Sequence, residues 1–295
     1  MEELLGYHYT TTEAFLSMTK KTLEQKDSDK YFEFWASSCL CMNDYVEMKH
    51  GYDVLLSLLK EVEDSNGERY RLSDVWETVK MEGMTDEQTY SFIRDNSFNM
   101  DYIPYAISFS FMQEQIPLWS MYADNGKGVC LCFDLNEITK LEELSFIPII
   151  YNYNTIKEEY KNMLRKIVQD ELLDFNKRVG KISDKEKIWY EKMSSMRTLS
   201  TVLSTYFKHF SFEFENEYRL VKYCGKELVE YRTNNNGSII PYTRIKIPFN
   251  ALKEITIGPC ADYKQKSSLM HTYMKYANPQ HHIDIKPSAL PFRMI

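Results

Sequence analysis

Hydrophobic and polar positions alternate between Phe212 and Leu220, which is the period of a β-strand. One face of such a strand carries the apolar side chains with Asn216, and the other carries four charged side chains, Glu213, Glu215, Glu217 and Arg219. Because burying unpaired charges is costly in free energy, the charged face cannot meet a closed apolar core. The pattern therefore predicts that this face meets water or lines a polar cleft.

Similar patterns predict the other elements. Strands are expected at residues 4–10, 31–38, 106–111, 129–133, 242–247, 254–257 and 282–285. Helical periodicity follows a capping-box pattern at residues 10–13, begins again at Pro117, and recurs at residues 52–100, 155–204 and 267–276. In the strand over residues 106–111, Ser108 and Ser110 share one face. On the first strand, Tyr7 and Tyr9 lie opposite His8 and Thr10.

Helices and strands are interspersed without regular βαβ alternation, which favours an α+β fold. Few Gly and Pro residues occur in the 295-residue chain, and no linker composition marks a boundary. We expect a single domain over residues 1–295. The strongly helical stretch at about 155–204 is interpreted as an insertion, because strands resume after it.

Charge and hydropathy restrict the classes of function. The net charge of -7 argues against a general basic surface for nucleic acid, although a local basic channel is compatible with it. The acidic start of the chain lacks the features of a signal peptide, and no window approaches the ~18 apolar residues of a membrane span. We therefore expect a cytoplasmic protein that has no membrane partner.

Four of the six cysteines form two pairs with one residue between them, Cys39/Cys41 and Cys130/Cys132. Four thiolates can bind zinc, but ligand pairs in zinc sites are usually separated by two to four residues. Cys130 and Cys132 also stand in an apolar run. The cysteines are interpreted as small buried hydrophobic residues, and no metal is expected.

Several blocks of residues together resemble a bacterial domain-of-unknown-function family. They are YHYT (7–10), WASS (35–38), ND (43–44), SFS (108–110), LWSMYADNGKGVC (118–130), ENEYR (215–219) and EITIGP (254–259). That family in turn distantly resembles the ADP-ribosyltransferases. The resemblance implies a split β-sheet core with inserted helices, NAD as the substrate, and a protein or nucleic acid as the acceptor. It also implies a toxin or an anti-phage effector as the biological setting.

The resemblance assigns a role to each matching residue. Glu217 would hold the ribose hydroxyls of NAD and stabilise the positive charge of an oxocarbenium-like transition state, while Glu215 would orient or deprotonate the acceptor. His8 would hold the adenosine-side ribose. The other residues expected to bind NAD are Tyr9, Thr10, Ser108, Ser110, Tyr122 and Arg219, with Arg219 either pairing with a carboxylate or binding a phosphate.

Three other functions are compatible with the same residues. A glycohydrolase would use the same site with water as the acceptor, and a binding or regulatory module would keep the cleft without its chemistry. A metal-dependent nuclease could use the carboxylate row, but a second Asp/His cluster at metal-ligand spacing is missing from the sequence.

Overall fold

The computed structural model describes residues 4–24, 30–42, 47–66, 70–75, 100–141, 143–233, 237–279 and 281–291, together with residues 85, 88 and 91. The strands are β1 (Leu5–Thr10), β2 (Tyr31–Ser38), β3 (Tyr102–Ser110), β4 (Val129–Asp134), β5 (Ser145–Pro148), β6 (Glu217–Gly225), β7 (Glu230–Thr233), β8 (Ile239–Pro248), β9 (Leu252–Ile257) and β10 (Asp284–Pro287). The α-helices are α1 (Thr12–Glu24), α2 (Glu47–Asn66), α5 (Ile116–Tyr122), α6 (Leu135–Ile138), α7 (Glu158–Val179), α8 (Lys185–Ser204) and α9 (Tyr263–Ala277).

The strands form one mixed sheet of 10 strands. The order along it is β10-β9-β4-β1-β3-β2-β8-β7, and β6 pairs with both β3 and β5. The pairs are antiparallel, apart from β9 with β10, which is parallel. This arrangement confirms the α+β prediction.

The sheet opens along one edge of β3, between β1 and β2, while the other edge of β3 is fully paired. This strand pairs with β6 along its whole length, from Tyr102 to Ser110. It meets β1 only at Tyr7 and Ser110, and it meets β2 only where Ser37 and Ser38 face Ala106 and Tyr105. Beyond these points β1 and β2 diverge from β3, which leaves backbone groups of β3 without a strand partner and makes room for side chains between the strands.

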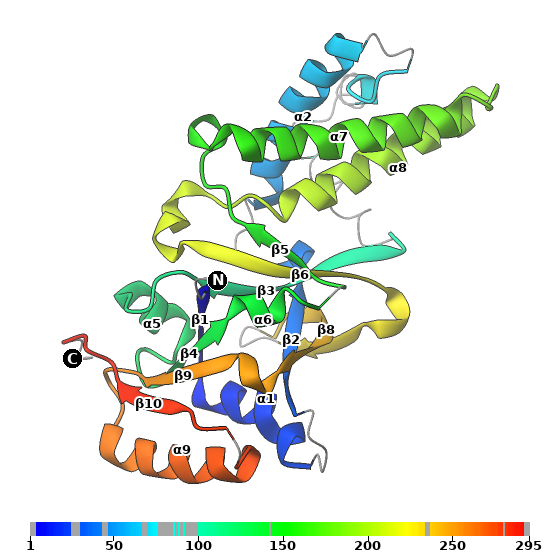
Figure 1. Cartoon of the computed structure of the whole chain (residues 1–295). Helices are drawn as coiled ribbons and strands as arrows, with labels where there is room; N and C mark the ends of the chain where they lie inside the picture. The colour runs from blue at the N-terminus through cyan, green and yellow to red at the C-terminus, as the bar shows by residue number, and fades with distance from the viewer. Residues whose placement is uncertain are drawn as a thin grey trace.

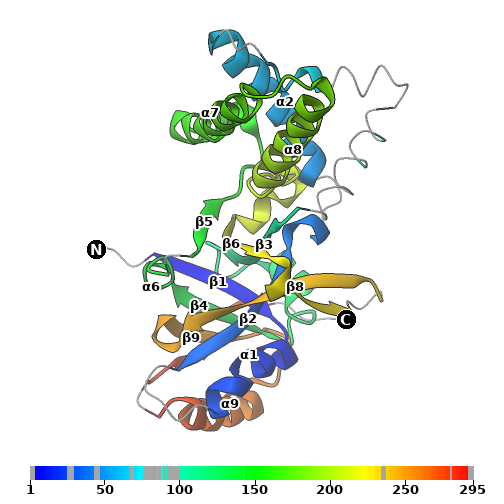
Figure 2. The same ribbon diagram turned by 90° about the vertical axis from the view of Figure 1, so that its right-hand side faces the viewer.

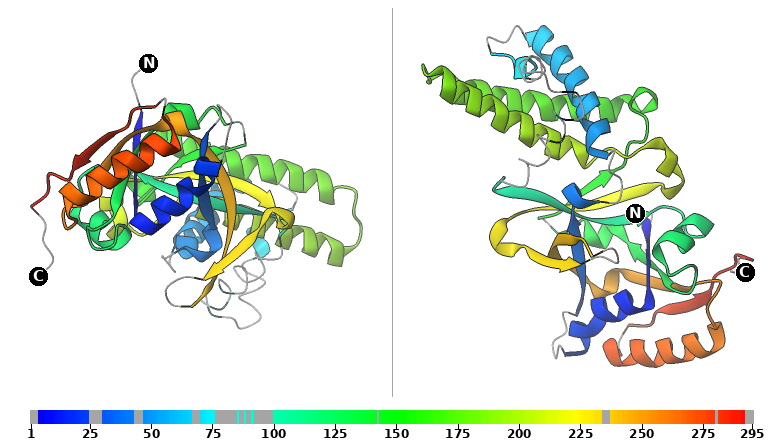
Figure 3. Two further views of the ribbon diagram at one scale, coloured as in Figure 1. Left: turned by 90° about the horizontal axis from the view of Figure 1, so that it is seen from below. Right: turned by 180° about the vertical axis from the view of Figure 1, so that it is seen from behind.

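The long helices lie at two ends of the molecule, with the strands and the short helices α5 and α6 between them (Figures 1 and 2). Helices α2, α7 and α8 pack against one another at one end. At the other end α1 packs on β2 and against α9, and α9 packs on β9 and β10, as the view from below also shows (Figure 3). The predicted helical pair is confirmed as α7 and α8.

The helical pair leaves and rejoins the sheet at neighbouring points. The chain leaves from β5 and returns to β6, and these two strands pair with each other. An isolated bridge between Ile150 and Phe207 closes the base of the pair. The single-domain organisation over residues 1–295 stays a prediction.

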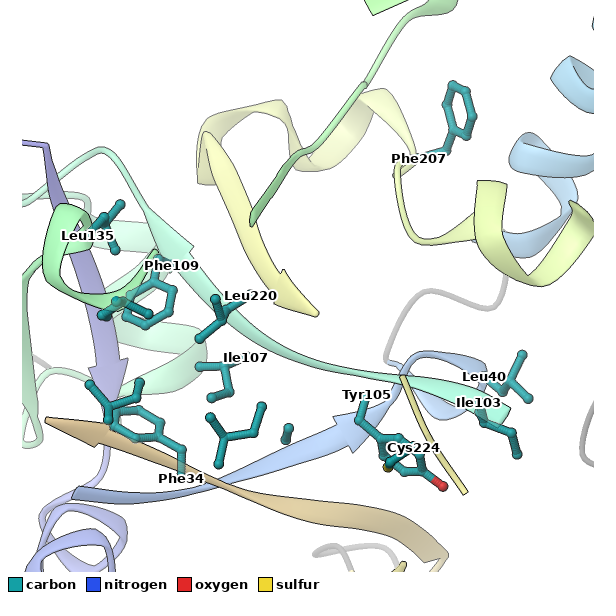
Figure 4. Close-up of a cluster of buried hydrophobic side chains, with 14 of the residues drawn as sticks. Phe34, Leu40, Ile103, Tyr105, Ile107, Phe109, Leu135, Phe207, Leu220 and Cys224 are labelled. Carbon is teal, nitrogen blue, oxygen red and sulfur yellow. The ribbon is translucent and has the colours of Figure 1, made fainter. Parts of the chain in front are cut away.

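The apolar core fills the opening next to β3. Figure 4 shows Phe34 of β2, Ile107 and Phe109 of β3 and Leu220 of β6 gathered together. The rings of Phe34 and Phe109 also contact Phe133 of β4 at centroid distances of 5.7 and 5.9 Å. The alternation over residues 106–111 is thereby confirmed: Ile107 and Phe109 face this core, and Ser108 and Ser110 face the other side.

The strand expected over residues 212–220 is wrong in its first half. Residues Phe210–Glu215 form a 3₁₀ helix, and Asn216 adopts a left-handed conformation with φ of 42°. Asn tolerates this region better than most residues, and its carbonyl accepts a hydrogen bond from the backbone N–H of Phe111. The strand β6 therefore begins only at Glu217.

Other differences concern the ends of elements. The helix α1 is capped by Thr11, whose Oγ1 accepts from the Ala14 N–H at 3.1 Å, and not by Thr10 as the capping-box pattern predicted. The strand β3 begins earlier and α9 is longer than predicted, and the short strands β5 and β7 were not predicted. Asn43 and Asp44, which belong to one motif block, lie outside the described residues.

The glycine-rich loop between α5 and β4 explains the longest motif block as a packing requirement. Asp124, Asn125 and Gly126 are consecutive residues with positive φ. A Cβ on Gly128 would lie 2.3 Å from the Thr10 carbonyl oxygen, and one on Gly258 would lie 2.2 Å from the Gly126 carbonyl oxygen. The small residues of this block let the loop approach β1 and the chain that follows β9.

We expect Gly128→Ala to lower the free energy of unfolding by about 1–3 kcal/mol, because the added methyl overlaps fixed backbone atoms. Urea titration followed by circular dichroism measures this change. Gly180→Ala at the end of α7 is the control, because its φ of -60° suits any residue. Equal urea midpoints for wild type and Gly128→Ala would refute the packing explanation.

Candidate functional site

A cavity of about 210 Å³ opens where β1 and β3 separate. Eight of the residues predicted as site residues line it: His8, Tyr9, Ser108, Ser110, Tyr122, Glu215, Glu217 and Arg219. We call it the acidic cavity, after its two carboxylates. The structure thus brings a histidine from the first strand and a glutamate from the last third of the chain to the same cavity.

A second cavity, of about 600 Å³, adjoins the acidic cavity, and we call it the outer cavity. The two share seven lining residues: His8, Tyr9, Ser37, Met42, Ser108, Tyr122 and Arg232. Thr10, the remaining predicted site residue, lines the outer cavity only. Together they form one continuous cleft that follows the opening of the sheet from β6 toward α1.

Glu217 lies at the floor of the acidic cavity and is only 4% exposed. Its Oε1 accepts hydrogen bonds from the Ser108 hydroxyl at 2.5 Å and from Arg219 Nε at 3.0 Å. Its Oε2 accepts from Lys208 Nζ at 3.0 Å and from Arg219 Nη2 at 3.4 Å. A carboxylate has about four acceptor positions, so all those of Glu217 are occupied.

Charge pairing keeps Glu217 ionised. Burial alone would raise the pKa of this carboxyl, but the charges of Arg219 and Lys208 and the hydrogen bonds from Arg219 and Ser108 lower it to about 2. The charged row predicted from the sequence therefore does not meet water at Glu217 and Arg219. It lines a polar cavity, as the alternative prediction stated, and its charges are buried because they are paired.

Glu215 contacts the cavity from the end of the 3₁₀ helix and is also 4% exposed. Its Oε1 accepts from the Tyr122 hydroxyl at 2.8 Å, and its Oε2 accepts from Lys208 Nζ at 2.5 Å. Two of its four acceptor positions are used by these contacts. Glu215 is therefore the carboxylate of the pair that has spare capacity to accept from a ligand.

His8 fills the gap between β1 and β3. Its Nδ1 lies 2.9 Å from the Ser108 carbonyl oxygen, which has no strand partner at this point. The ring packs against Phe34 and Phe109 at centroid distances of 5.1 and 5.8 Å. Burial among these rings lowers the pKa of His8, against the opposing effect of the Ser108 carbonyl. A neutral imidazole that donates from Nδ1 keeps Nε2 as an acceptor for a ligand hydroxyl.

The two serines of β3 have different roles. Ser108 donates to Glu217, while its own carbonyl accepts from His8. Ser110 donates to the Glu215 carbonyl at 2.6 Å and accepts from the Met112 N–H at 2.9 Å, so its hydroxyl fixes the backbone on either side of the cavity. A continuous chain of hydrogen bonds runs from β1 through Ser108 to the first residue of β6.

Tyr9 and Arg219 are held by the protein itself. The Tyr9 hydroxyl donates to the Met112 and Gln113 carbonyl oxygens, so only the ring of Tyr9 is presented to the cavity. Arg219 is fully buried, and its Nη1 donates to the Thr205 carbonyl at 3.2 Å while the rest of the guanidinium contacts Glu217. Of the two pairings expected for Arg219, the structure shows the one with a carboxylate, that of Glu217.

The sequence patterns did not predict three polar side chains of the site, those of Lys208, Tyr151 and Arg232. Lys208, which bridges the two carboxylates, follows α8 directly in the chain. The Tyr151 hydroxyl accepts from the Glu217 N–H at 2.9 Å. Arg232 of β7 lines both cavities. No local pattern marks any of them, because their partners come from distant parts of the chain.

The cysteines do not gather at the site. Cys39, Cys130 and Cys132 are buried thiols, and Cys39 and Cys41 lie in a 3₁₀ helix instead of a strand. Within the part of the chain that the structure describes, no three His, Cys, Asp or Glu side chains are placed to hold a metal ion. Nor does any helix in that part have the length and apolar character needed to cross a membrane.

Comparison with known proteins gives a family match for one segment of the chain. No curated protein and no solved structure matches the chain. The matched segment runs from α5 to β6 and carries Tyr122, Lys208, Glu215, Glu217 and Arg219, but not His8 or Ser108. Residues 118–220 match the family described as "Protein of unknown function (DUF2971)".

Proposed function

We propose that this protein is an NAD-dependent ADP-ribosyltransferase that modifies a protein or a nucleic acid. The observation that carries the proposal is the chain of hydrogen bonds from His8 through Ser108 to Glu217 at one cavity. His8 and Glu217 match the resemblance to ADP-ribosyltransferases in type and in chain order, and Ser108 joins them. The opening of the sheet between β1 and β2, along one edge of β3, supports the split-sheet core that the same resemblance implies.

The chemistry favours a carboxylate and needs little acid catalysis. Nicotinamide leaves NAD as a neutral molecule, and the ribose passes through an oxocarbenium-like state, as in glycoside cleavage. Glu217 is ionised at neutral pH, because its pKa is about 2. A fixed anion at this position stabilises the positive charge that develops on the ribose, without any reorganisation during the reaction.

Lys208 and Arg219 carry as much positive charge as the two carboxylates carry negative charge. A ribose hydroxyl that binds Glu217 must take the place of one existing donor, because all its acceptor positions are occupied. Lys208 is the donor that can move at least cost, since Glu215 already accepts from it. We infer that substrate binding shifts Lys208 toward Glu215 and frees Glu217 Oε2.

Glu215 is assigned the acceptor side of the reaction. Its two unused acceptor positions can bind the hydroxyl or amine of an acceptor, which the carboxylate then orients or deprotonates. Tyr122 positions this carboxylate through its hydroxyl and presents its ring to both cavities. In this proposal the ring contacts the nicotinamide of bound NAD.

Incubation of the pure protein with NAD labelled in the adenylate moiety, with and without a cell lysate, tests the proposal. We expect free nicotinamide by liquid chromatography and label on a macromolecule of the lysate. Nicotinamide release without any labelled macromolecule would identify a glycohydrolase instead. Unchanged NAD in the presence of protein, DNA and RNA acceptors would reject both enzymes and favour a binding module.

A further inference from the structure

Arg232 presents a guanidinium to the junction of the two cavities. It belongs to the short edge strand β7 and lines both the acidic cavity and the outer cavity. Its Nη2 donates to the Ser37 hydroxyl at 2.9 Å, which fixes the side chain against β2. Its Nε is shielded from water and has no hydrogen-bond partner among the described residues.

Arg232 differs from several other described arginines in how its charge is paired. Arg219 pairs with Glu217, Arg244 pairs with Glu33 and Glu230, and Arg165 and Arg178 each pair with two glutamates. Among the residues that the structure describes, no carboxylate forms an ion pair with Arg232. A half-buried guanidinium with an unused donor favours an anion, and its planar fork suits phosphate oxygens.

The surroundings define what the anion must be attached to. On one side lie Glu215 and Glu217, and on the other the outer cavity has an apolar wall that includes Met18, Phe34 and Trp35. Among the described residues, the carboxylates that line the outer cavity are Glu13 and Glu33, and Glu33 is paired with Lys21 and Arg244. An occupant of the whole cleft therefore has an anionic middle, a polar end that meets Glu215 and Glu217, and a less polar end in the outer cavity.

We propose that Arg232 binds the phosphates of a dinucleotide whose ribose lies at Glu217 and whose base lies in the outer cavity. The residue is thereby a substrate-binding residue that selects compounds with a diphosphate over nucleosides. The identity of the dinucleotide as NAD rests on the proposed function. Recognition of the phosphates does not, because it depends only on the unpaired guanidinium and on the continuity of the two cavities.

Isothermal titration with ADP and with adenosine tests this assignment. We expect the wild type to bind ADP roughly ten- to a hundredfold more tightly than adenosine, the difference that one or two charge-assisted hydrogen bonds produce. Arg232→Gln is expected to remove this preference by weakening ADP binding and leaving adenosine binding unchanged. Arg232→Lys is expected to retain part of it, because it keeps the charge but loses the fork.

Arg178→Gln is the matched control. It removes the same charge from α7, outside both cavities, and should keep the full preference for ADP. The assignment is overturned if Arg232→Gln still prefers ADP, or if it loses ADP and adenosine binding equally. It is also overturned if the wild type binds both compounds with the same affinity.

NAD turnover separates the two proposals. If the wild type does not consume NAD but Arg232→Gln abolishes the preference for ADP, the phosphate site stands and the proposed function fails. If the wild type consumes NAD and Arg232→Gln has the same KM for NAD, the proposed function stands and the phosphate assignment fails. Under both proposals together, Arg232→Gln raises KM about tenfold or more and changes kcat little, because the interaction is the same in the ground state and the transition state.

Discussion

Glu217→Gln is expected to lower the rate of nicotinamide release from NAD about 10²- to 10³-fold, the cost of removing one preorganised electrostatic group from an active site. The glutamine keeps the shape of the side chain but not the charge that faces the ribose. The measurement is kcat from the initial rate of nicotinamide release at saturating NAD. Because the loss of a buried charge also weakens the fold, each variant is assayed well below its own melting temperature.

Glu217→Asp provides a second variant that keeps the charge. The shorter side chain withdraws the carboxylate by one methylene, and a misplacement of this size costs about 10²-fold in rate. Lys208 and Arg219 still have a buried anion to pair with. A low rate in Glu217→Gln then reports on the loss of the charge, and a low rate in Glu217→Asp reports on its position and not on unfolding.

Two neighbouring glutamates supply the controls. Glu213 is exposed in the same 3₁₀ helix, and Glu213→Gln should retain the wild-type rate. Glu215→Gln should reduce transfer to a macromolecule more than it reduces release of nicotinamide, because water can still attack the ribose. If Glu217→Gln and Glu213→Gln released nicotinamide at the same rate, the catalytic role of Glu217 would be wrong.

The strands near the site could be predicted from the sequence because their patterns are local. In β1, β2 and β4 successive side chains alternate between the two faces of the sheet, and no distant contact changes this alternation. The predicted ranges accordingly lie within one residue of the observed strands. The site residues His8, Tyr9 and Thr10 of β1 are then assigned by the resemblance to a known family.

The segment from Phe212 to Leu220 shows where a local pattern is insufficient. Its alternation is compatible with a strand, yet the first half is a 3₁₀ helix because Asn216 turns the chain back onto Phe111. That contact joins positions far apart in the sequence. The carboxylates of Glu215 and Glu217 still both line the cavity, and Lys208 holds them together by donating to each.

The cations of the site could not be predicted from the sequence. Lys208 and Arg232 are two of the 36 Lys and Arg residues, and neither stands in a distinctive pattern. What distinguishes them is geometric: the ammonium of Lys208 is buried between two carboxylates, and the guanidinium of Arg232 lies beside a serine of another strand. Only the tertiary fold brings Lys208 to the two carboxylates and Arg232 to Ser37.

The same ion pairs predict a marked acid sensitivity of the fold. The pKa of Glu217 is about 2 in the folded protein, against an ordinary value of 4.5. A lowered pKa stabilises the fold fully above the ordinary value, and this stabilisation is lost as the pH falls from 4.5 toward 2. At about 1.4 kcal/mol per pKa unit, Glu217 contributes about 3 kcal/mol at neutral pH, of which about 2 kcal/mol is lost by about pH 3.

Glu217→Gln should therefore unfold more easily than the wild type at neutral pH, by about 3–5 kcal/mol, because it leaves buried cations with one anion too few. The difference between the two proteins should shrink by about 2 kcal/mol when the pH is lowered from about 6 to about 3, since the wild type is then losing the same charge. Urea titrations of both proteins across this range measure the difference directly, which cancels the titration of every other group. Glu213→Gln should remain parallel to the wild type at all pH values, because its carboxylate is exposed. A constant difference between Glu217→Gln and the wild type would mean that Glu217 titrates normally and that Lys208 and Arg219 do not hold it in the ionised form.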